Sequence, residues 1–375
     1  MRGRLVLEDR IASGTLEIAD GLISRVILDV QPSDDGPYIC PGYVDIHVHG
    51  WGGHSAMDGR AALDGMARAL LRQGVTSFLP TAVTAPLAAL EEFAASVRSW
   101  LAYAPADGAQ PLGFNLEGPF LSPKRAGAQD PAHLRVPSDV ALDSLEPLLD
   151  GLRVITVAPE LPGALDLIGW LSGRGVVVSL GHSDASYSEA TDGYLAGARS
   201  TTHLFNAMSG VDHRHPGLAV VALRDPRVWV ELIADLVHVH GSLWSIVSGA
   251  KPTGTLILVS DGIGLGGMGD GRGRLGSLEV EVAGPRATLA GTTTLAGSVT
   301  GLGTMVRNLS HLVDERVAGL PYAVAAASRN PLDLLRIFDR GVIAPGKRAD
   351  LVELGEDRLV RRVMLAGTWH EFDAG

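Results

Sequence analysis

The sequence predicts an α/β protein: a (β/α)8 TIM-like barrel accompanied by a small β-sandwich domain built from both chain ends. Apolar runs of strand length alternate with Ala- and Leu-rich segments whose apolar residues recur at helical spacing. This alternation repeats through eight units, and short strand-like segments stand at both ends of the chain. An open doubly wound sheet is the competing architecture, but such a sheet seldom contains so many regular units.

Both ends of the chain contain short strand-like segments. The N-terminal part reads RLVLED, GTLEIAD and LISRVILDV, separated by Ala-Ser-Gly and Ala-Asp-Gly turn signals. The C-terminal part reads GVIAPGKRADLVEL and RLVRRVMLAGTWHEF. We therefore expect residues 1–41 and 341–375 to pair into one small β-domain, and residues 42–340 to form the barrel.

Strand-like runs that end in polar residues define the barrel. They are YVDIHVH (43–49), VTSFLPT (75–81), LGFNLEG (112–118), LRVITVAPE (152–160), VVVSLGH (176–182), STTHLF (200–205), VWVELIAD (228–235) and LILVSD (256–261). After Asp261 the regularity lapses into a Gly-rich stretch, 262–276. A hairpin over 277–291 and helices over 295–313 and 330–338 are expected to follow.

Composition narrows the class of protein. A hydrophobic content of 46% supplies a core, and a formal net charge of −11 argues against a nucleic-acid partner. The single cysteine, Cys40, excludes an intrachain disulfide and a thiolate-rich zinc cluster. No apolar run approaches the ~20 residues of a membrane span, and the first residues lack a signal-peptide core. We expect a cytoplasmic protein that binds no membrane.

The run 43–49 carries the first candidate site. His47 and His49 share one face of a strand, about 6–7 Å apart, a spacing at which two imidazoles can hold one metal ion. The same pattern also occurs as the polar face of an edge strand. The choice between these interpretations depends on partners elsewhere in the chain.

Such partners follow several other strand-like runs, at the barrel end where active sites lie. The full set of ligand-type residues at strand ends is His47, His49, Glu117, His182, His203 and Asp261. Four imidazoles and two carboxylates suit one or two divalent ions, with Zn, Fe, Mn and Co all compatible.

Ten stretches of the chain resemble one family in that family's order. They include PGYVDIHVHGWGG (41–53), NLEGPFLSPKRAGAQDP (115–131), GHSDASY (181–187), THLFNAM (202–208), HPGL (215–218), IADLVHVH (233–240), LVSDG (258–262) and GVIAPGKRADLV (341–352). The chain resembles the amidohydrolase superfamily and, within it, the N-acetylglucosamine-6-phosphate deacetylases. The resemblance implies hydrolysis of the acetamide of N-acetylglucosamine-6-phosphate to glucosamine-6-phosphate and acetate.

The resemblance also implies roles for the strand-end residues. Glu117, His182 and His203 are implied as ligands of one metal ion. His47 and His49 are implied to hold a second ion, bridged by Glu117, which some members lack. Asp261 is implied as the general acid–base, a role that suits a carboxylate because an amine leaves poorly unless it is protonated.

Substrate residues are implied in the same way. Asn206 and Ala207 are implied to donate to the phosphate, together with Arg214 and His238. In the family these last two come from a neighbouring subunit, which implies a homodimer. Gln129 stands where the family usually has His, and this substitution bears on substrate preference or on the metal site.

Other functions remain open at this point. The substrate could be a related N-acetyl sugar, such as the galactosamine 6-phosphate isomer or an unphosphorylated sugar, or an N-acyl amino acid. A protein of another class, a non-catalytic sugar-phosphate-binding protein, is the further alternative. None of the lysines ends a strand-like run, which argues against the carboxylated-lysine chemistry of hydantoinases. GLGGMG (264–269) matches a dinucleotide fingerprint, but the residues after it do not favour a helix, so we expect a loop.

Overall fold

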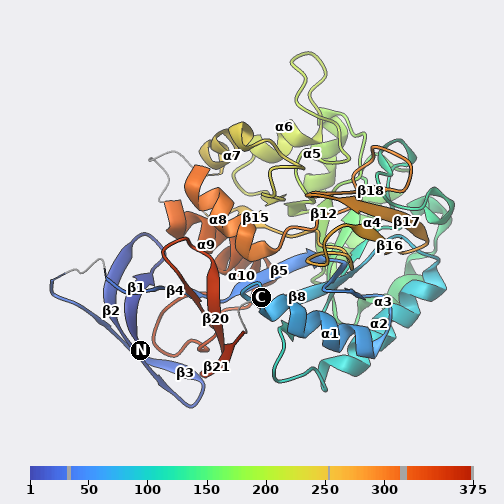
Figure 1. Ribbon diagram of the computed structural model, residues 1–375. Helices are drawn as coiled ribbons and strands as arrows, with labels where there is room; N and C mark the ends of the chain where they lie inside the picture. Colours follow the sequence, from blue (N-terminus) through green and yellow to red (C-terminus); the bar gives the residue numbers. More distant parts are fainter. Residues whose placement is uncertain (32–34, 252–253, 313–318, 373–375) are drawn as a thin grey trace.

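The computed structural model describes residues 1–31, 35–251, 254–312 and 319–372. Within these residues, eight parallel strands form a barrel in which neighbours in the chain are neighbours in the sheet (Figure 1). They are β5 (Tyr43–Val48), β8 (Val75–Ala82), β10 (Phe114–Glu117), β11 (Leu152–Val157), β12 (Val177–Leu180), β13 (Ser200–Thr201), β14 (Trp229–Leu232) and β15 (Leu256–Leu258). A parallel bridge between Val48 and Gly262 joins the chain beyond β15 to β5. The predicted (β/α)8 fold is confirmed, and each expected run overlaps one of these strands.

Helices cover the outside of the barrel, and the first of them buries one face. In α1, the buried residues Leu63, Met66, Ala67, Leu70 and Leu71 recur at the spacing of one helical face. The helices are α1 (Arg60–Leu71), α2 (Leu87–Leu101), α3 (Glu146–Leu149), α4 (Ala164–Gly173), α5 (Tyr187–Leu195), α6 (Leu218–Arg224), α7 (Trp244–Ala250), α8 (Leu302–Leu312), α9 (Gly319–Ala327) and α10 (Arg329–Leu335). The helix expected over 295–313 begins only at Leu302, because Gly297 has a positive φ of 66° and Ser298 bonds to the strand-end backbone at Asp261. Residue 313 lies outside the described part.

The two ends of the chain share one sheet, as expected. Its strand order is β21–β20–β19–β4–β1–β2–β3, so that β4 lies between an N-terminal and a C-terminal neighbour. Their bounds are β1 (Arg2–Val6), β2 (Ile11–Ala19), β3 (Leu22–Leu28), β4 (Tyr38–Pro41), β19 (Leu351–Leu354), β20 (Val360–Leu365) and β21 (Thr368–Glu371). An antiparallel bridge from Leu22 to Arg348 brings the segment before β19 against β3. The sheet therefore folds around its own core of Leu5, Leu16, Ile23, Ile39, Ile343, Ala349, Leu351 and Met364.

A second small sheet is inserted between β15 and α8. It contains β16 (Gly271–Leu275), β17 (Leu278–Ala283) and β18 (Arg286–Leu289), all antiparallel. The expected hairpin is confirmed as β17–β18, whereas β16 falls in the stretch we expected to be a Gly-rich loop. Residues 264–269 are followed by this strand and not by a helix, which removes the basis of a dinucleotide fingerprint. β16 forms because its backbone pairs with β17 and Leu275 packs with Val280, for which glycines elsewhere in the strand are no obstacle.

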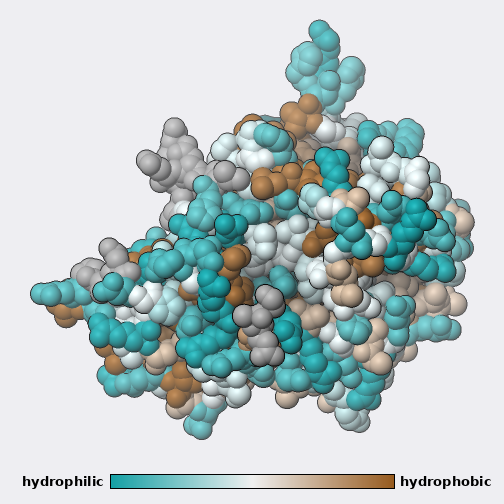
Figure 2. Space-filling model, viewed as in Figure 1, coloured by the Kyte–Doolittle hydropathy of each residue, from teal (hydrophilic) through white to brown (hydrophobic). Residues whose placement is uncertain are grey.

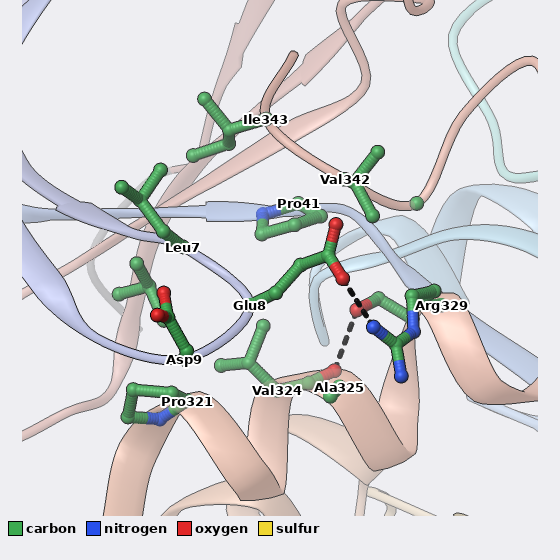
Figure 3. A pocket seen from close by; sticks show the side chains of 13 residues that line it. Leu7, Glu8, Asp9, Pro41, Pro321, Val324, Ala325, Arg329, Val342 and Ile343 are labelled. Atoms are coloured by element: carbon green, nitrogen blue, oxygen red, sulfur yellow. Dashed lines mark hydrogen bonds and ion pairs between the residues drawn. The ribbon is translucent and has the colours of Figure 1, made fainter. Parts of the chain in front are cut away.

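The terminal sheet meets the barrel beside α9 and α10. A cavity of about 420 Å³ lies in this junction, between apolar side chains such as Leu7, Val324 and Ile343 (Figure 3). The Glu8–Arg329 ion pair crosses it. Pro41, which lines the cavity, comes just before β5, so the junction lies at the opposite end of that strand from His47 and His49. Among the described helices, none combines the length and apolar character that crossing a membrane requires.

Candidate active site

The ligand-type residues of the sequence meet at the carboxyl-terminal end of the barrel. His47 lies in β5 and Glu117 is the last residue of β10, while the others follow strands. All are at least nine-tenths buried: His47, His49, Glu117, His182, His203 and Asp261. The strand-end positions chosen from sequence therefore converge because parallel strands of one barrel end on the same side.

Three of these residues leave their strands through an unusual backbone conformation. His182, His203 and Asp261 have φ angles of 46°, 26° and 48°. Positive φ is uncommon for residues other than glycine and is held only where surrounding contacts fix it. Here the contacts are those of the barrel rim, such as the Asp261 N–H donated to the His47 carbonyl at 2.9 Å.

One cluster contains Glu117, His182 and His203. Glu117 Oε1 lies 2.8 Å from His203 Nε2 and 3.0 Å from His182 Nε2, and the two Nε2 atoms are 3.1 Å apart. His182 Nδ1 faces the Arg125 carbonyl at 2.8 Å. Since a carbonyl only accepts, Nδ1 carries the proton, and Nε2 turns a lone pair toward the cluster.

A second cluster contains His47, His49 and Asp261. Asp261 Oδ1 lies 3.3 Å from His49 Nε2 and 3.6 Å from His47 Nε2. Glu117 lies between the clusters, with Oε1 3.4 Å from His47 Nε2 and Oε2 3.2 Å from His49 Nε2. One carboxylate thus faces the ligand atoms of both groups.

The donor set fits divalent metal ions. In each cluster the three ligand atoms lie within 4.8 Å of one another. Within the described residues, His47 Nε2 is buried and lacks a hydrogen-bond partner. Buried imidazole nitrogens that face carboxylates and each other are the ligands that Zn²⁺ and related ions take. The structure therefore supports a divalent metal centre.

The charges of the site also favour a bound cation. Burial disfavours the ionised form of Glu117, but His47 and His182 outweigh it and hold the Glu117 pKa well below its ordinary value. Burial disfavours the charged form of His49, yet Asp261 and Glu117 raise its pKa to about 9. The carboxylates thus attract positive charge strongly enough to overcome desolvation, and a divalent ion supplies that charge.

Asp261 is a carboxylate at neutral pH. Burial raises its pKa, but the hydrogen bond from His49 and the charge of His47 lower the pKa below its ordinary value. An ionised carboxylate beside the metal ligands is placed to accept a proton.

Gln129 supports Glu117 through a side-chain hydrogen bond. Its Nε2 donates to Glu117 Oε2, and its Oε1 accepts from the Thr84 N–H at 2.7 Å. The Thr84 hydroxyl in turn donates to the Glu117 carbonyl at 3.2 Å. The backbone donor at Thr84 fixes which end of the amide points at the carboxylate, so Gln129 acts as a donor to Glu117.

Two supporting carboxylates were not among the residues singled out from sequence. Glu231 Oε2 lies 3.1 Å from His47 Nδ1 and accepts from the His203 N–H at 3.2 Å. Asp45 Oδ1 accepts from the Ser260 N–H at 3.2 Å, and burial raises the Asp45 pKa to about 6. The available signal was a single acidic residue inside each of two apolar strands, YVDIHV and WVEL.

A cavity of about 430 Å³ opens onto both clusters. Of the predicted substrate residues, Gln129, Asn206, Ala207 and His238 line it. His238 Nδ1 lies 2.7 Å from Asp235 Oδ2 in the same chain. The expectation that His238 reaches the site from a neighbouring subunit is therefore wrong, because β14 and its loop deliver this imidazole to the chain's own cavity.

Arg214 lies elsewhere. It belongs to a hydrophilic loop between β13 and α6 that projects from the molecule (Figures 1 and 2). Asp212 Oδ1 accepts from the backbone N–H groups of Arg214 at 2.8 Å and His215 at 2.7 Å, which shapes the loop tip. Among the described residues that line the cavity, the lysine and arginine side chains are those of Lys124 and Arg125. Arg214 of the same chain does not line the cavity.

Comparison with known proteins places these features in a family. The model of the Amidohydrolase family matches residues 38–370. The N-acetylgalactosamine-6-phosphate deacetylase of Escherichia coli is 37% identical, over 95% of this chain and 94% of that protein. The N-acetylglucosamine-6-phosphate deacetylase of Bacillus subtilis is 36% identical, over 92% and 90%.

Solved structures of deacetylases are also similar to this chain. A point mutant of the Mycobacterium smegmatis N-acetyl-D-glucosamine-6-phosphate deacetylase, in complex with N-acetyl-D-glucosamine-6-phosphate, matches with a TM-score of 0.90. Its identity is 33%, with 98% of this chain and 97% of that chain covered. The Thermotoga maritima N-acetylglucosamine-6-phosphate deacetylase also gives a TM-score of 0.90, at 31% identity and 98% coverage of both chains.

Proposed function

Because this chain belongs to the amidohydrolase family, we propose that it hydrolyses N-acetylglucosamine-6-phosphate to glucosamine-6-phosphate and acetate. The observation that carries this proposal is the pair of buried ligand clusters that share Glu117 at the floor of a cavity. A non-catalytic sugar-phosphate-binding protein has no need of an ionised Asp261 beside such a centre.

The residues of the site have two roles: five are metal ligands, and Asp261 is the general acid–base. Glu117, His182 and His203 would hold one divalent ion, and His47 and His49 a second. When bound, such an ion acidifies water and polarises the acetamide carbonyl.

Asp261 takes a proton from the attacking water while the water oxygen bonds to the acetyl carbon. It then gives that proton to the sugar nitrogen as the C–N bond breaks, so that the amine leaves in its protonated form. Because the pKa of Asp261 lies below its ordinary value, the side chain is ionised at neutral pH and free to accept this proton.

The phosphate end of the substrate faces the polar lining of the cavity. The Asn206 amide, the backbone of Ala207 and the His238 imidazole are the proposed donors. Arg214 joins them from a second copy of the chain, which makes the protein a homodimer. Its exposed position on a projecting loop supports this assignment.

The substrate also supports a cytoplasmic location. A sugar phosphate is charged and does not readily cross a lipid bilayer. An enzyme that hydrolyses a sugar phosphate formed in the cytoplasm therefore works in the cytoplasm.

The test measures acetate released from N-acetylglucosamine-6-phosphate by protein stripped with a chelator and then loaded with Zn²⁺, Fe²⁺, Mn²⁺ or Co²⁺. Metal content is measured on the same samples. We expect activity that disappears on stripping and returns with at least one ion. Loaded protein that releases no acetate would refute the proposal.

The galactosamine isomer is the second candidate substrate, favoured by the identity of 37% to the Escherichia coli enzyme that bears its name. The two sugars differ in the orientation of one hydroxyl group. The ratio of kcat/KM for the two 6-phosphates decides between them, and the unphosphorylated sugars and N-acyl amino acids serve as comparison substrates.

A further inference from the structure

Glu231 stands behind the metal ligands without being one of them. It lies in β14 with 1% of its surface exposed. Its Oε2 atom lies 3.1 Å from Nδ1 of His47, on the far side of the ring from Nε2. Since a carboxylate only accepts, His47 carries its proton on Nδ1, and Nε2 is left to bind an ion.

The group that faces Nδ1 of His47 is a carboxylate, whereas backbone carbonyls face Nδ1 of two other ligand histidines. His49 Nδ1 faces the Thr81 carbonyl at 3.2 Å, and His182 Nδ1 faces the Arg125 carbonyl at 2.8 Å. Neither carbonyl carries a net charge. Within the described residues, His47 is the ligand histidine whose ring is backed by a carboxylate, an arrangement that fixes the ring and makes it a stronger donor to a metal.

The same carboxylate is also tied to the other cluster. Glu231 Oε2 accepts from the His203 N–H at 3.2 Å, and the Leu204 N–H donates to the Glu231 carbonyl at 2.8 Å. The turn that carries His203 and the ring of His47 are therefore held by one residue. A change at Glu231 acts directly on the ring of His47 and on His203 only through its backbone.

We propose that Glu231 is a positioning residue that sets the affinity of the second metal position, at His47 and His49, and thereby decides whether the protein holds two ions or one. This inference rests on the proposed function in one respect: it requires that the site binds metal ions. The second metal position depends on Glu231 because Glu231 orients and polarises the His47 ring, whose Nε2 atom would bind the second ion. The first position, at Glu117, His182 and His203, keeps all its ligands, and Glu231 contacts it only at the backbone N–H of His203.

The experiment titrates metal-free protein with Co²⁺ and Zn²⁺, without substrate, and compares wild type with Glu231→Gln. We expect two ions per chain in the wild type. In Glu231→Gln we expect the second ion to bind about 10–100-fold more weakly, with a smaller change for the first. The Co²⁺ absorption spectrum reports the two positions separately from activity.

Glu160→Gln is the matched control. Glu160 accepts from the Ser183 hydroxyl at 2.7 Å and the Asp184 N–H at 2.6 Å, so it also supports the loop of a ligand histidine. It contacts the loop and not an imidazole, and we expect Glu160→Gln to bind both ions as the wild type does.

Each outcome bears on a different claim. Equal affinity for the second ion in wild type and Glu231→Gln overturns the inference and leaves the deacetylase proposal intact. A wild type that binds no ion refutes the metal centre itself. Should Glu231→Gln fail to fold, Glu231→Asp replaces it: a second ion weakened about tenfold or more supports the inference, and unchanged binding overturns it.

Discussion

Replacing Asp261 by Asn tests the proton path with the smallest change of shape. The variant keeps the volume of the side chain and an oxygen near His49, which lies 3.3 Å from Asp261 Oδ1 in the wild type. It removes the negative charge and the ability to accept the proton of water. The first ligand cluster, Glu117, His182 and His203, contains all its own members and is expected to keep its ion.

The expected loss follows from the role. A positioned general acid–base contributes about 10²–10⁴-fold to the rate, which corresponds to about 2.7–5.5 kcal/mol of activation free energy. We therefore expect kcat for acetate release to fall by about this factor at saturating metal and substrate. The loss should be present at neutral pH, because the pKa of the wild-type Asp261 lies below its ordinary value and the carboxylate is ionised there.

Acetate release, metal content and the pH profile are measured on the same preparation. Asp184→Asn is the control, because the Asp184 carboxylate pairs with Lys124 and Arg125 and not with the ligand histidines. It should keep kcat. An Asp261→Asn variant with kcat within about tenfold of the wild type, at full metal loading, would refute the assignment of the proton path to Asp261.

Three further predictions concern other parts of the chain. Gln129→Ala should weaken metal binding about 10–100-fold because Glu117 Oε2 loses its donor, and Gln129→His should retain more affinity, as measured by titration of metal-free protein. Arg214→Ala should lower kcat/KM about 10–100-fold for the 6-phosphate and leave the unphosphorylated sugar unchanged; equal losses on both would contradict a phosphate contact. Hydrogen bonds from Arg227 lower the Asp225 pKa from 3.8 to about 2, so this contribution to stability is present above about pH 4 and is lost as pH falls toward 2. Because Arg227 is 83% exposed, Asp225→Asn should cost only about 0.5–1 kcal/mol of unfolding free energy at pH 7, and urea titrations should show the two proteins converging at low pH.

The barrel was predictable because its signal is local and repeated. Each strand is a short apolar run that stands out from the helical spacing around it, as in VTSFLPT before α2. The insert was less predictable. The stretch from 271 to 275 reads GRGRL, which has no strand pattern of its own, and β16 forms only because β17 offers a backbone partner.

The metal ligands were predictable for a related reason. His, Glu and Asp are rare at the ends of apolar strands, so their recurrence after several strands marked one end of the barrel. Glu231 was missed because it lies within its strand and not after the end of it, and because its partner, His47, is 184 positions away in the chain. The family resemblance assigned His238 to a neighbouring subunit, whereas His238 lines the cavity of its own chain.

The sequence by itself determined the fold class, the end of the barrel that carries the site, and the residue types that meet there. These follow from periodicity and from the geometry of parallel strands, which bring every strand end to one side. Only the tertiary structure decided the distances at which Glu117 faces both clusters, that Gln129 donates to Glu117, and that Glu231 contacts the ring of His47. Those are contacts between side chains far apart in the chain, and their distances depend on how the strands close into a barrel.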